Sequence, residues 1–505
     1  MNRRVFLQTA GGCAACALVG GCGSSGLTSG LFERTRYASF EEMPRPYDTK
    51  INVQFLKGQR IPKELHVGPC RANSPESWDR DAEVETARNR FASWANSVDQ
   101  GLTPKAHALE PMYIEYAGDH RVSKADWKRI EERLGSVDVF AVDYRVPGLE
   151  RYKKPIIELG NQCASMDVPA ALRAQGHEAY GAYGQEELNA ILSAMQVRKA
   201  MGETKVLSVT DGPWTYEYNT VRSNIPTDVL ESRLGIGCKY LKIREFMDEF
   251  LQISADSALQ TEARRITTEL LGNAEAVHMK EEYVLKSVNY YLTAKRLMAR
   301  TGCNAYTATC QEFCVSRNPL KYEITPCLTH TLLKDQAYPS ACEGDLNVLA
   351  AIAMLTYLSG KSVHMGNGVV YKDNQEFLRL QHDVPGRKMK GFEEASVPYE
   401  IVPFTEPGWG ATVRYDFGRD RGQPVTLVRW NPEATKVLVT SGSVEKAEGV
   451  RRWGCSLLAI LRVRDSFAYF EKAQDFGHHQ AMVYGDYRAE IGRLGEIMDF
   501  EVVEV

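Results

Sequence analysis

The stretch PCLTHTLLKDQAYPSACEGDLNVLAAIAMLTYLSGKSVHMGN, from Pro326 to Asn367, carries the pattern on which our prediction of the fold depends. Apolar residues at spacings of three and four predict a buried helix before Gly360: Leu346, Leu349, Ala350, Ala353, Met354 and Tyr357. We place Glu343 and Asp345 in its first turn, where the helix dipole favours negative charge. Acidic residues are common there, so this pattern alone fits an ordinary helix start equally well.

The residues after this helix predict a short strand followed by a polar loop. Ser362 to Met365 has the composition of a strand, and the sequence Gly366-Asn367-Gly368 should break it. Many sites of α/β proteins are built from loops that follow strands. We therefore interpret Glu343 and Asn367 as two polar positions flanking one helix–strand unit, and as half of a functional site.

Three features of this stretch resemble the L-fucose/L-arabinose isomerase superfamily: the PC pair at Pro326, the ACEGD motif, and a helix that ends in glycine before a short strand. The resemblance implies a divalent metal, most often manganese, held by a Glu at this helix start, an acid after the next strand, and histidines further on. Glu343 matches the first ligand by motif. The second acid falls on Asn367, where an amide departs from the family pattern.

Two later motifs resemble the metal-histidine motifs of this family. His382 ends a segment that alternates like a strand from Phe377. The GHHQAMVYGD motif resembles the closing motif of the family, in which the register favours His479 over His478 as the ligand. A lone histidine at a strand end is more often structural. Two such motifs in the expected order after Glu343 favour a metal site, and one carboxylate with two imidazoles suits manganese, iron, cobalt or zinc.

The resemblance also implies contacts with a sugar substrate. It places a polar side chain near the end of a strand over 305–309, where Gln311 or Glu312 can reach the sugar, and His478 is a further candidate. Relatives assemble as trimers or hexamers in which a neighbouring subunit closes the site, so we expect a homo-oligomer. These assignments rest on the resemblance alone.

Aldose–ketose isomerisation through an enediol needs a metal and acid/base groups that serve two adjacent carbons. Glu343 can act as the base, whereas Asn367 cannot return a proton because an amide does not titrate near neutral pH. The sequence does not decide which residue is the second proton carrier, and the candidates are four acids: Glu312, Asp345, Asp373 and Asp383. Three hypotheses follow: a metal-dependent isomerase or epimerase, a different metal-assisted reaction such as elimination, and a non-catalytic sugar-binding lipoprotein.

The composition is that of an ordinary globular protein. The chain has 505 residues, 44% hydrophobic and 25% charged, with a formal net charge of −4. This balance is typical of globular proteins and does not favour a nucleic-acid partner. The length exceeds what one core usually serves, so two or three domains are expected.

The N-terminal residues predict export. Arg3-Arg4 followed by Val5, Phe6 and Leu7 and a small, apolar run has the form of a twin-arginine signal. The sequence LVGGC, ending at Cys22, also resembles a lipoprotein cleavage site, which would make Cys22 the lipidated first residue; the alternative is a plain signal peptide cut near Gly30. We expect a periplasmic protein, membrane-anchored if Cys22 carries lipid.

The alternation of strand and helix patterns predicts an α/β fold. We expect two doubly wound, Rossmann-like or flavodoxin-like domains and a C-terminal α+β domain that contains a small β-barrel. The predicted boundaries follow in chain order: signal 1–22, linker 23–50, N-terminal domain 51–168, central domain 169–320 and C-terminal isomerase-like domain 321–505.

Overall fold

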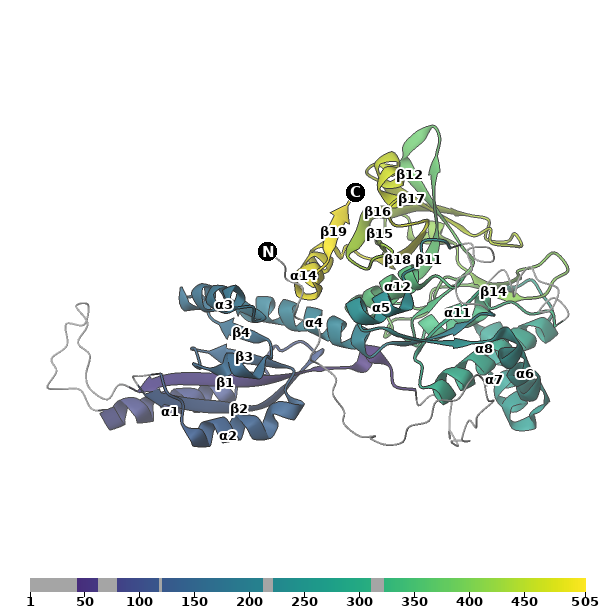
Figure 1. The fold of residues 1–505 in the computed structure, drawn as a ribbon. Helices are drawn as coiled ribbons and strands as arrows, with labels where there is room; N and C mark the ends of the chain where they lie inside the picture. Colours follow the sequence, from purple (N-terminus) through teal and green to yellow (C-terminus); the bar gives the residue numbers. More distant parts are fainter. Residues whose placement is uncertain (1–42, 62–79, 118–119, 212–220, 310–321) are drawn as a thin grey trace, which may run out of the picture.

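A computed structural model describes residues 43–61, 80–117, 120–211, 221–309 and 322–505 of the chain. Figure 1 shows an N-terminal sheet with its helices on one side of the molecule, and the C-terminal strands and the helices α6 to α8 (residues 243–301) on the other. Two parallel sheets and one closed antiparallel barrel account for most of the strands. The predicted α/β class with a small C-terminal barrel is confirmed in this form.

The N-terminal sheet is parallel and has the order β2-β1-β3-β4-β5. Strands β3, β4 and β5 are short and mostly buried, as is typical of a sheet covered on both faces, whereas β1 and β2 have 11 and 12 residues. Helices α1 and α2 lie on one face, and α3 and α4 lie on the other (Figure 1). The elements are β1 (Ile51–Ile61), α1 (Arg80–Ala95), β2 (Ala106–Ala117), α2 (Lys124–Arg133), β3 (Val139–Asp143), β4 (Ile156–Leu159), α3 (Ala164–Ala174), β5 (Ala179–Ala182) and α4 (Gln185–Gly202).

A second parallel sheet has the order β10-β9-β6-β7 and leads directly to the predicted site. Its last strand, β10, lies beyond residue 320, and the chain continues from its carboxyl end to Glu343. The elements are β6 (Lys205–Val209), α5 (Thr227–Leu234), β7 (Gly237–Leu241), α6 (Ile243–Ala255), α7 (Ser257–Asn273), α8 (Glu281–Thr301), β9 (Ala305–Ala308), α11 (Cys327–Lys334) and β10 (Ser340–Ala341).

The C-terminal strands form a closed six-stranded antiparallel barrel in the order β15-β18-β11-β12-β17-β16, because β16 also pairs with β15. Alternating residues such as Leu378, Leu380 and Leu427 belong to its buried cluster. The elements are β11 (His364–Tyr371), β12 (Asn374–Gln381), β15 (Pro424–Trp430), β16 (Lys436–Glu448), β17 (Leu458–Val463), α13 (Ser466–Ala473) and β18 (His479–Tyr484), with β19 (Glu501–Glu504) paired to β16 and a small sheet of β8 (Ala276–Val277), β13 (Glu400–Pro403) and β14 (Ala411–Arg414).

The prediction that Gly366-Asn367-Gly368 breaks a strand is wrong, because all three residues lie inside β11. The two glycines are needed for packing. A Cβ atom on Gly366 would lie 2.8 Å from Cγ of Leu380, and one on Gly368 would overlap the hydroxyl of Tyr469. Asn367 is therefore a strand residue held in a fixed register.

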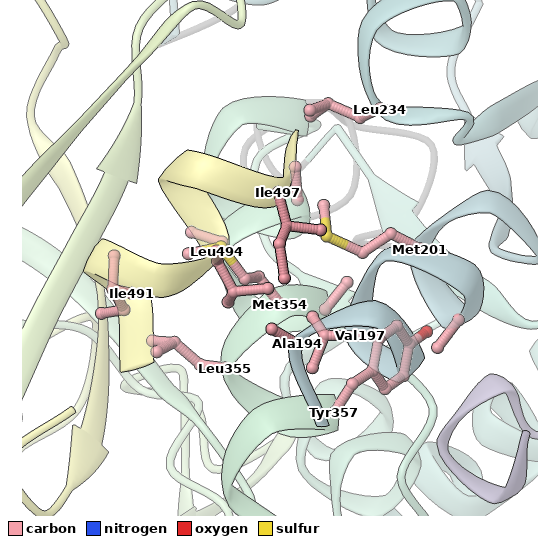
Figure 2. Close-up of a cluster of buried hydrophobic side chains, with 14 of the residues drawn as sticks. Ala194, Val197, Met201, Leu234, Met354, Leu355, Tyr357, Ile491, Leu494 and Ile497 are labelled. Atoms are coloured by element: carbon pink, nitrogen blue, oxygen red, sulfur yellow. The ribbon is translucent and has the colours of Figure 1, made fainter. Parts of the chain in front are cut away.

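Helix α12 (Leu346–Ser359) is the apolar helix predicted from the opening stretch, and it lies at the centre of the molecule. Figure 2 shows its residues Met354, Leu355 and Tyr357 packed between α4 and α14 (Arg488–Met498). The helix begins three residues after Glu343, so the prediction that places Glu343 in its first turn is wrong. Glu343 lies in the turn between β10 and α12.

The last residues of the predicted linker belong to the folded part of the chain. Met43 is buried, Pro46–Asp48 forms a 3-10 helix, and the Tyr338 hydroxyl donates a 2.7 Å hydrogen bond to the Met43 carbonyl. Within the described residues, the helices are all too short or too polar to cross a bilayer.

Replacing Leu494 with Ala is expected to lower the free energy of unfolding by about 2–5 kcal/mol, because the side chain is fully buried against α4 and α12. Leu251→Ala is the matched control, since Leu251 is 46% exposed on α6, and it should change stability by about 0.5 kcal/mol or less. Urea denaturation followed by circular dichroism measures both. Equal effects of the two substitutions would contradict this packing.

Candidate metal centre

Glu343 projects from a tight turn at the carboxyl end of β10. Glu343 and Gly344 both adopt left-handed backbone conformations, with φ of 63° and 67°. The Gly344 amide donates to the Ala308 carbonyl of β9 over 3.1 Å, which ties the turn to the parallel sheet. Carboxyl ends of parallel strands are where α/β proteins usually place ligands. The turn thus presents Glu343 beyond the edge of the sheet, toward the barrel.

The structure brings Glu343, His382 and His479 together from three separate segments. One oxygen or nitrogen from each lies within 4.8 Å of the others. Nε2 of His382 is 3.3 Å from Glu343 Oε1, and Nε2 of His479 is 3.8 Å from Glu343 Oε2. His382 follows β12 and His479 begins β18, so both reach the centre from one end of barrel strands. Among the described residues, these three form the one His/Cys/Asp/Glu group close enough to hold a metal ion.

Asp345 orients His479. Its Oδ2 accepts hydrogen bonds from His479 Nδ1 (2.9 Å) and Arg429 Nη1 (2.7 Å), while its Oδ1 accepts from the Val348 amide (3.0 Å) and caps α12. Burial alone would raise the pKa of Asp345, but Arg429 and His479 outweigh burial and hold this pKa well below its usual range. The ionised carboxylate keeps the imidazole proton on Nδ1, so the lone pair of Nε2 faces Glu343.

His382 is held beside a second buried ion pair. The next residue, Asp383, pairs with Arg414, and both side chains are fully buried. Asp383 Oδ1 also accepts from the Leu457 amide at 3.1 Å. Nδ1 of His382 accepts from the Asp383 amide at 3.2 Å, which places the ring proton on Nε2. A metal at this Nε2 requires that proton to move to Nδ1, at the cost of this hydrogen bond.

Asn367 lies beside His479 in the barrel. The two residues are directly paired across β11 and β18, so their side chains point to the same face of the sheet. His478 also lies next to the centre, with its ring centroid 4.2 Å from that of His479. Burial, together with His479 and Arg429, lowers the pKa of His478 to about 4, so its imidazole is neutral near pH 7.

The other acids considered as a second proton carrier do not join the three-residue group. Asp345 and Asp383 are engaged in the buried ion pairs with arginine. Asp373 lies in the turn between β11 and β12. Gln311, Glu312 and the lipidation candidate Cys22 lie outside the described residues.

The sequence-based prediction missed the residues that support the histidines, above all Arg429 and Arg414. Each is fully buried and bonded to an aspartate that lies far away in sequence. A weak signal was present, because Arg429 ends the apolar strand sequence PVTLVR and a buried arginine needs a buried partner.

The three residues fit a divalent transition metal. The His479 Nε2 atom is buried and has no hydrogen-bond partner among the described residues, while its Nδ1 is fixed by Asp345. A carboxylate and two imidazoles are ligands that manganese, iron, cobalt and zinc accept. An aspartate that orients a histidine ligand through its second nitrogen is a common supporting contact in metal sites.

The chain is similar to a known sugar isomerase. Sulfoquinovose isomerase from Alkalicoccus urumqiensis is 25% identical over 184 residues, which are 35% of this chain and 40% of the relative. The match therefore spans well under two thirds of the isomerase. A search against protein-family models found no match.

Asp345→Asn is expected to weaken metal binding about 10- to 100-fold, because the amide no longer holds His479 in one tautomer. It should also lower the free energy of unfolding by about 3–5 kcal/mol, because Arg429 loses its buried counter-ion. Asp486→Asn is the control, since the Asp486–Arg488 pair is largely exposed and contributes about 1 kcal/mol or less. Titration with Mn²⁺ and urea denaturation measure the two effects. Unchanged Mn²⁺ affinity in the Asp345 variant would contradict the orienting role.

Proposed function

We propose that this protein is a metal-dependent, isomerase-like enzyme that acts on a sugar. The observation that carries the proposal is the convergence of Glu343, His382 and His479, with ligand atoms within 4.8 Å of one another. The similarity to a sulfoquinovose isomerase supports a sugar as the substrate. Mn²⁺ is the metal we propose, on the family resemblance and on the donor set.

In this proposal Glu343 is the base. Its carboxylate is 14% exposed, whereas the two histidines are 1% and 0% exposed, so Glu343 is the member of the group that a substrate can reach. It would take the proton from the carbon next to the sugar carbonyl, and the electron pair left behind forms the double bond of an enediol. The ketose forms when that proton returns to the former carbonyl carbon and the proton of the neighbouring hydroxyl moves to the former carbonyl oxygen. A divalent ion, when bound, would polarise the carbonyl and the neighbouring hydroxyl.

A second candidate function is a reaction that needs one base, such as elimination. It is favoured by Asn367, which shares a face with His479 and cannot act as an acid or base, because an amide does not titrate near neutral pH. The remaining alternative is a sugar-binding lipoprotein without activity. A buried histidine that is held in orientation and faces a glutamate favours an enzyme over this alternative.

We also propose an exported location and an oligomeric state. Arg3-Arg4 and the sequence ending at Cys22 support twin-arginine export and a lipid anchor. A homo-oligomer is proposed from the resemblance to the isomerase superfamily.

Incubation of the Mn²⁺-loaded protein in heavy water with a panel of aldoses, ketoses and oxidised sugars is expected to place deuterium on the carbon next to the carbonyl of one of them. NMR of the sugars, after removal of protein and Mn²⁺, measures this exchange even without net isomerisation. Glu343→Gln should slow the exchange by a factor of about 100 or more, because the base is lost. Glu376→Gln removes an exposed carboxylate paired with Arg462 on the barrel surface and should leave the rate unchanged.

The outcomes separate the candidates. Deuterium in the product ketose supports an isomerase, whereas exchange without a ketose supports epimerisation or elimination. Sugar binding with no exchange at any position supports the binding protein. Full exchange by Glu343→Gln would eliminate Glu343 as the base, and protein that purifies and titrates without any bound divalent metal would eliminate both enzyme candidates.

Cys22→Ala is expected to abolish incorporation of a labelled fatty acid and to shift the protein from the membrane to the soluble periplasmic fraction, because the lipidated thiol is gone. Replacing Arg3 and Arg4 with Lys should retain the protein in the cytoplasm. Cell fractionation in a bacterium with the twin-arginine pathway measures both. Fatty-acid labelling of the Cys22→Ala variant would contradict the lipidation site.

A further inference from the structure

Residues 221–225, which precede α5, lie against the turn that carries Glu343. The side chain of Asn224 contacts this turn on both sides of Asp345. Its Oδ1 accepts from the Leu346 amide at 2.8 Å, and its Nδ2 donates to the Gly344 carbonyl at 3.4 Å. Asn224 thus holds the residues that directly follow Glu343.

This support matters because the turn is intrinsically unfavourable. Glu343 is a non-glycine residue in a left-handed conformation, and Gly344 continues it. Such a conformation persists only where the surroundings enforce it, and it is concentrated at functional sites. The Leu346 amide is also one of the first-turn amides of α12 that have no partner within the helix. Asn224 satisfies that amide from outside the helix and fixes the turn at the same time.

The neighbouring residue, Ser223, contacts the support of the other ligand. Its Oγ accepts from Arg429 Nη2 at 3.2 Å. The same guanidinium donates to Asp345 Oδ2 at 2.7 Å and to the His479 carbonyl at 3.1 Å. Ser223 is therefore linked to the His479 ring through Arg429 and Asp345.

The segment is itself fixed from several sides. The Ile225 amide donates to Asn347 Oδ1 at 2.8 Å, and Asn347 Nδ2 donates to the Trp430 carbonyl at 3.0 Å. Gly477 packs closely against Ser223 and Arg429. A Cβ atom on Gly477 would lie 2.7 Å from Arg429 Nη2 and would overlap Ser223 Oγ. The adjacent side chains of Ser223 and Asn224 thus have defined positions. Asn224 contacts the turn that carries Glu343, and Ser223 contacts the arginine that supports His479 through Asp345.

We propose that Ser223 and Asn224 are positioning residues that set the separation of Glu343 and His479 for metal binding. Asn224 acts through the Gly344 turn on Glu343, and Ser223 acts through Arg429 and Asp345 on His479. This inference rests on the metal centre of the proposed function and goes beyond it, because it assigns control of metal affinity to a segment that supplies no ligand. Residues that support metal ligands in this way commonly change affinity 10- to 100-fold when replaced.

The test is the Mn²⁺ affinity of Ser223→Ala, Asn224→Ala and the double variant in the full chain without sugar, from the free Mn²⁺ signal in electron paramagnetic resonance. Each single variant should bind Mn²⁺ about 10-fold or more weakly, and the double variant more weakly than either. Asn224→Asp keeps the acceptor for Leu346, loses the donor to Gly344 and adds a negative charge that favours a cation, so it should recover part of the affinity. Asn374→Ala is the control, because Asn374 accepts a comparable hydrogen bond from the Glu376 amide in an exposed hairpin.

The thermal midpoint without added metal distinguishes positioning from a general loss of structure. A positioning role predicts that Asn224→Asp and Asn224→Ala differ in Mn²⁺ affinity. Their thermal midpoints should differ from each other by no more than the midpoint of Asn374→Ala differs from that of the wild type. Affinities that fall only in proportion to the midpoint would overturn the inference, as would a double variant with the affinity of the wild type. If the wild-type protein does not bind Mn²⁺, both this inference and the proposed function are overturned. If the wild type binds Mn²⁺ and the double variant binds it equally well, this inference alone is overturned.

Discussion

The buried carboxylate of Asp345 is the contact on which the candidate centre depends. Its two oxygens cap α12, pair with Arg429 of β15 and orient His479 of β18. A buried ion pair is costly to form and more costly to break, because loss of one partner leaves an unpaired charge away from water. Asp345 therefore joins the central helix to two barrel strands at the point where His479 faces Glu343.

The second buried pair, Asp383 with Arg414, follows the same principle at His382. In both pairs an arginine balances the negative charge of an aspartate that lies next to a histidine proposed to bind the metal. The two aspartates are thus committed to structure, and Glu343 remains as the carboxylate of the group. This division of roles explains how, in the part of the chain that the structure describes, three acidic residues lie near the centre while Glu343 alone is placed to bind a metal or to accept a proton.

The architecture explains how distant segments meet. The carboxyl edge of a parallel sheet supplies the Glu343 turn and the 221–225 segment, and one end of the antiparallel barrel supplies both histidines. Register across β11 and β18 then places Asn367 on the same face as His479. The amide at this position leaves a centre of one carboxylate and two imidazoles, which keeps reactions with a single base among the candidates.

The sequence alone determined the apolar helix before Gly360, the order of Glu343, His382 and His479, and the change from α/β to β patterns, because these depend on local periodicity and on short motifs. It could not determine the left-handed turn at Glu343 or the continuity of β11 through its glycines, since the neighbours that enforce both come from other strands and segments. It also could not pair Arg429 with Asp345 or Arg414 with Asp383. Burial and partner choice arise only when the sheet and the barrel pack together, and this packing decides which charged residues stabilise the fold and which face the site.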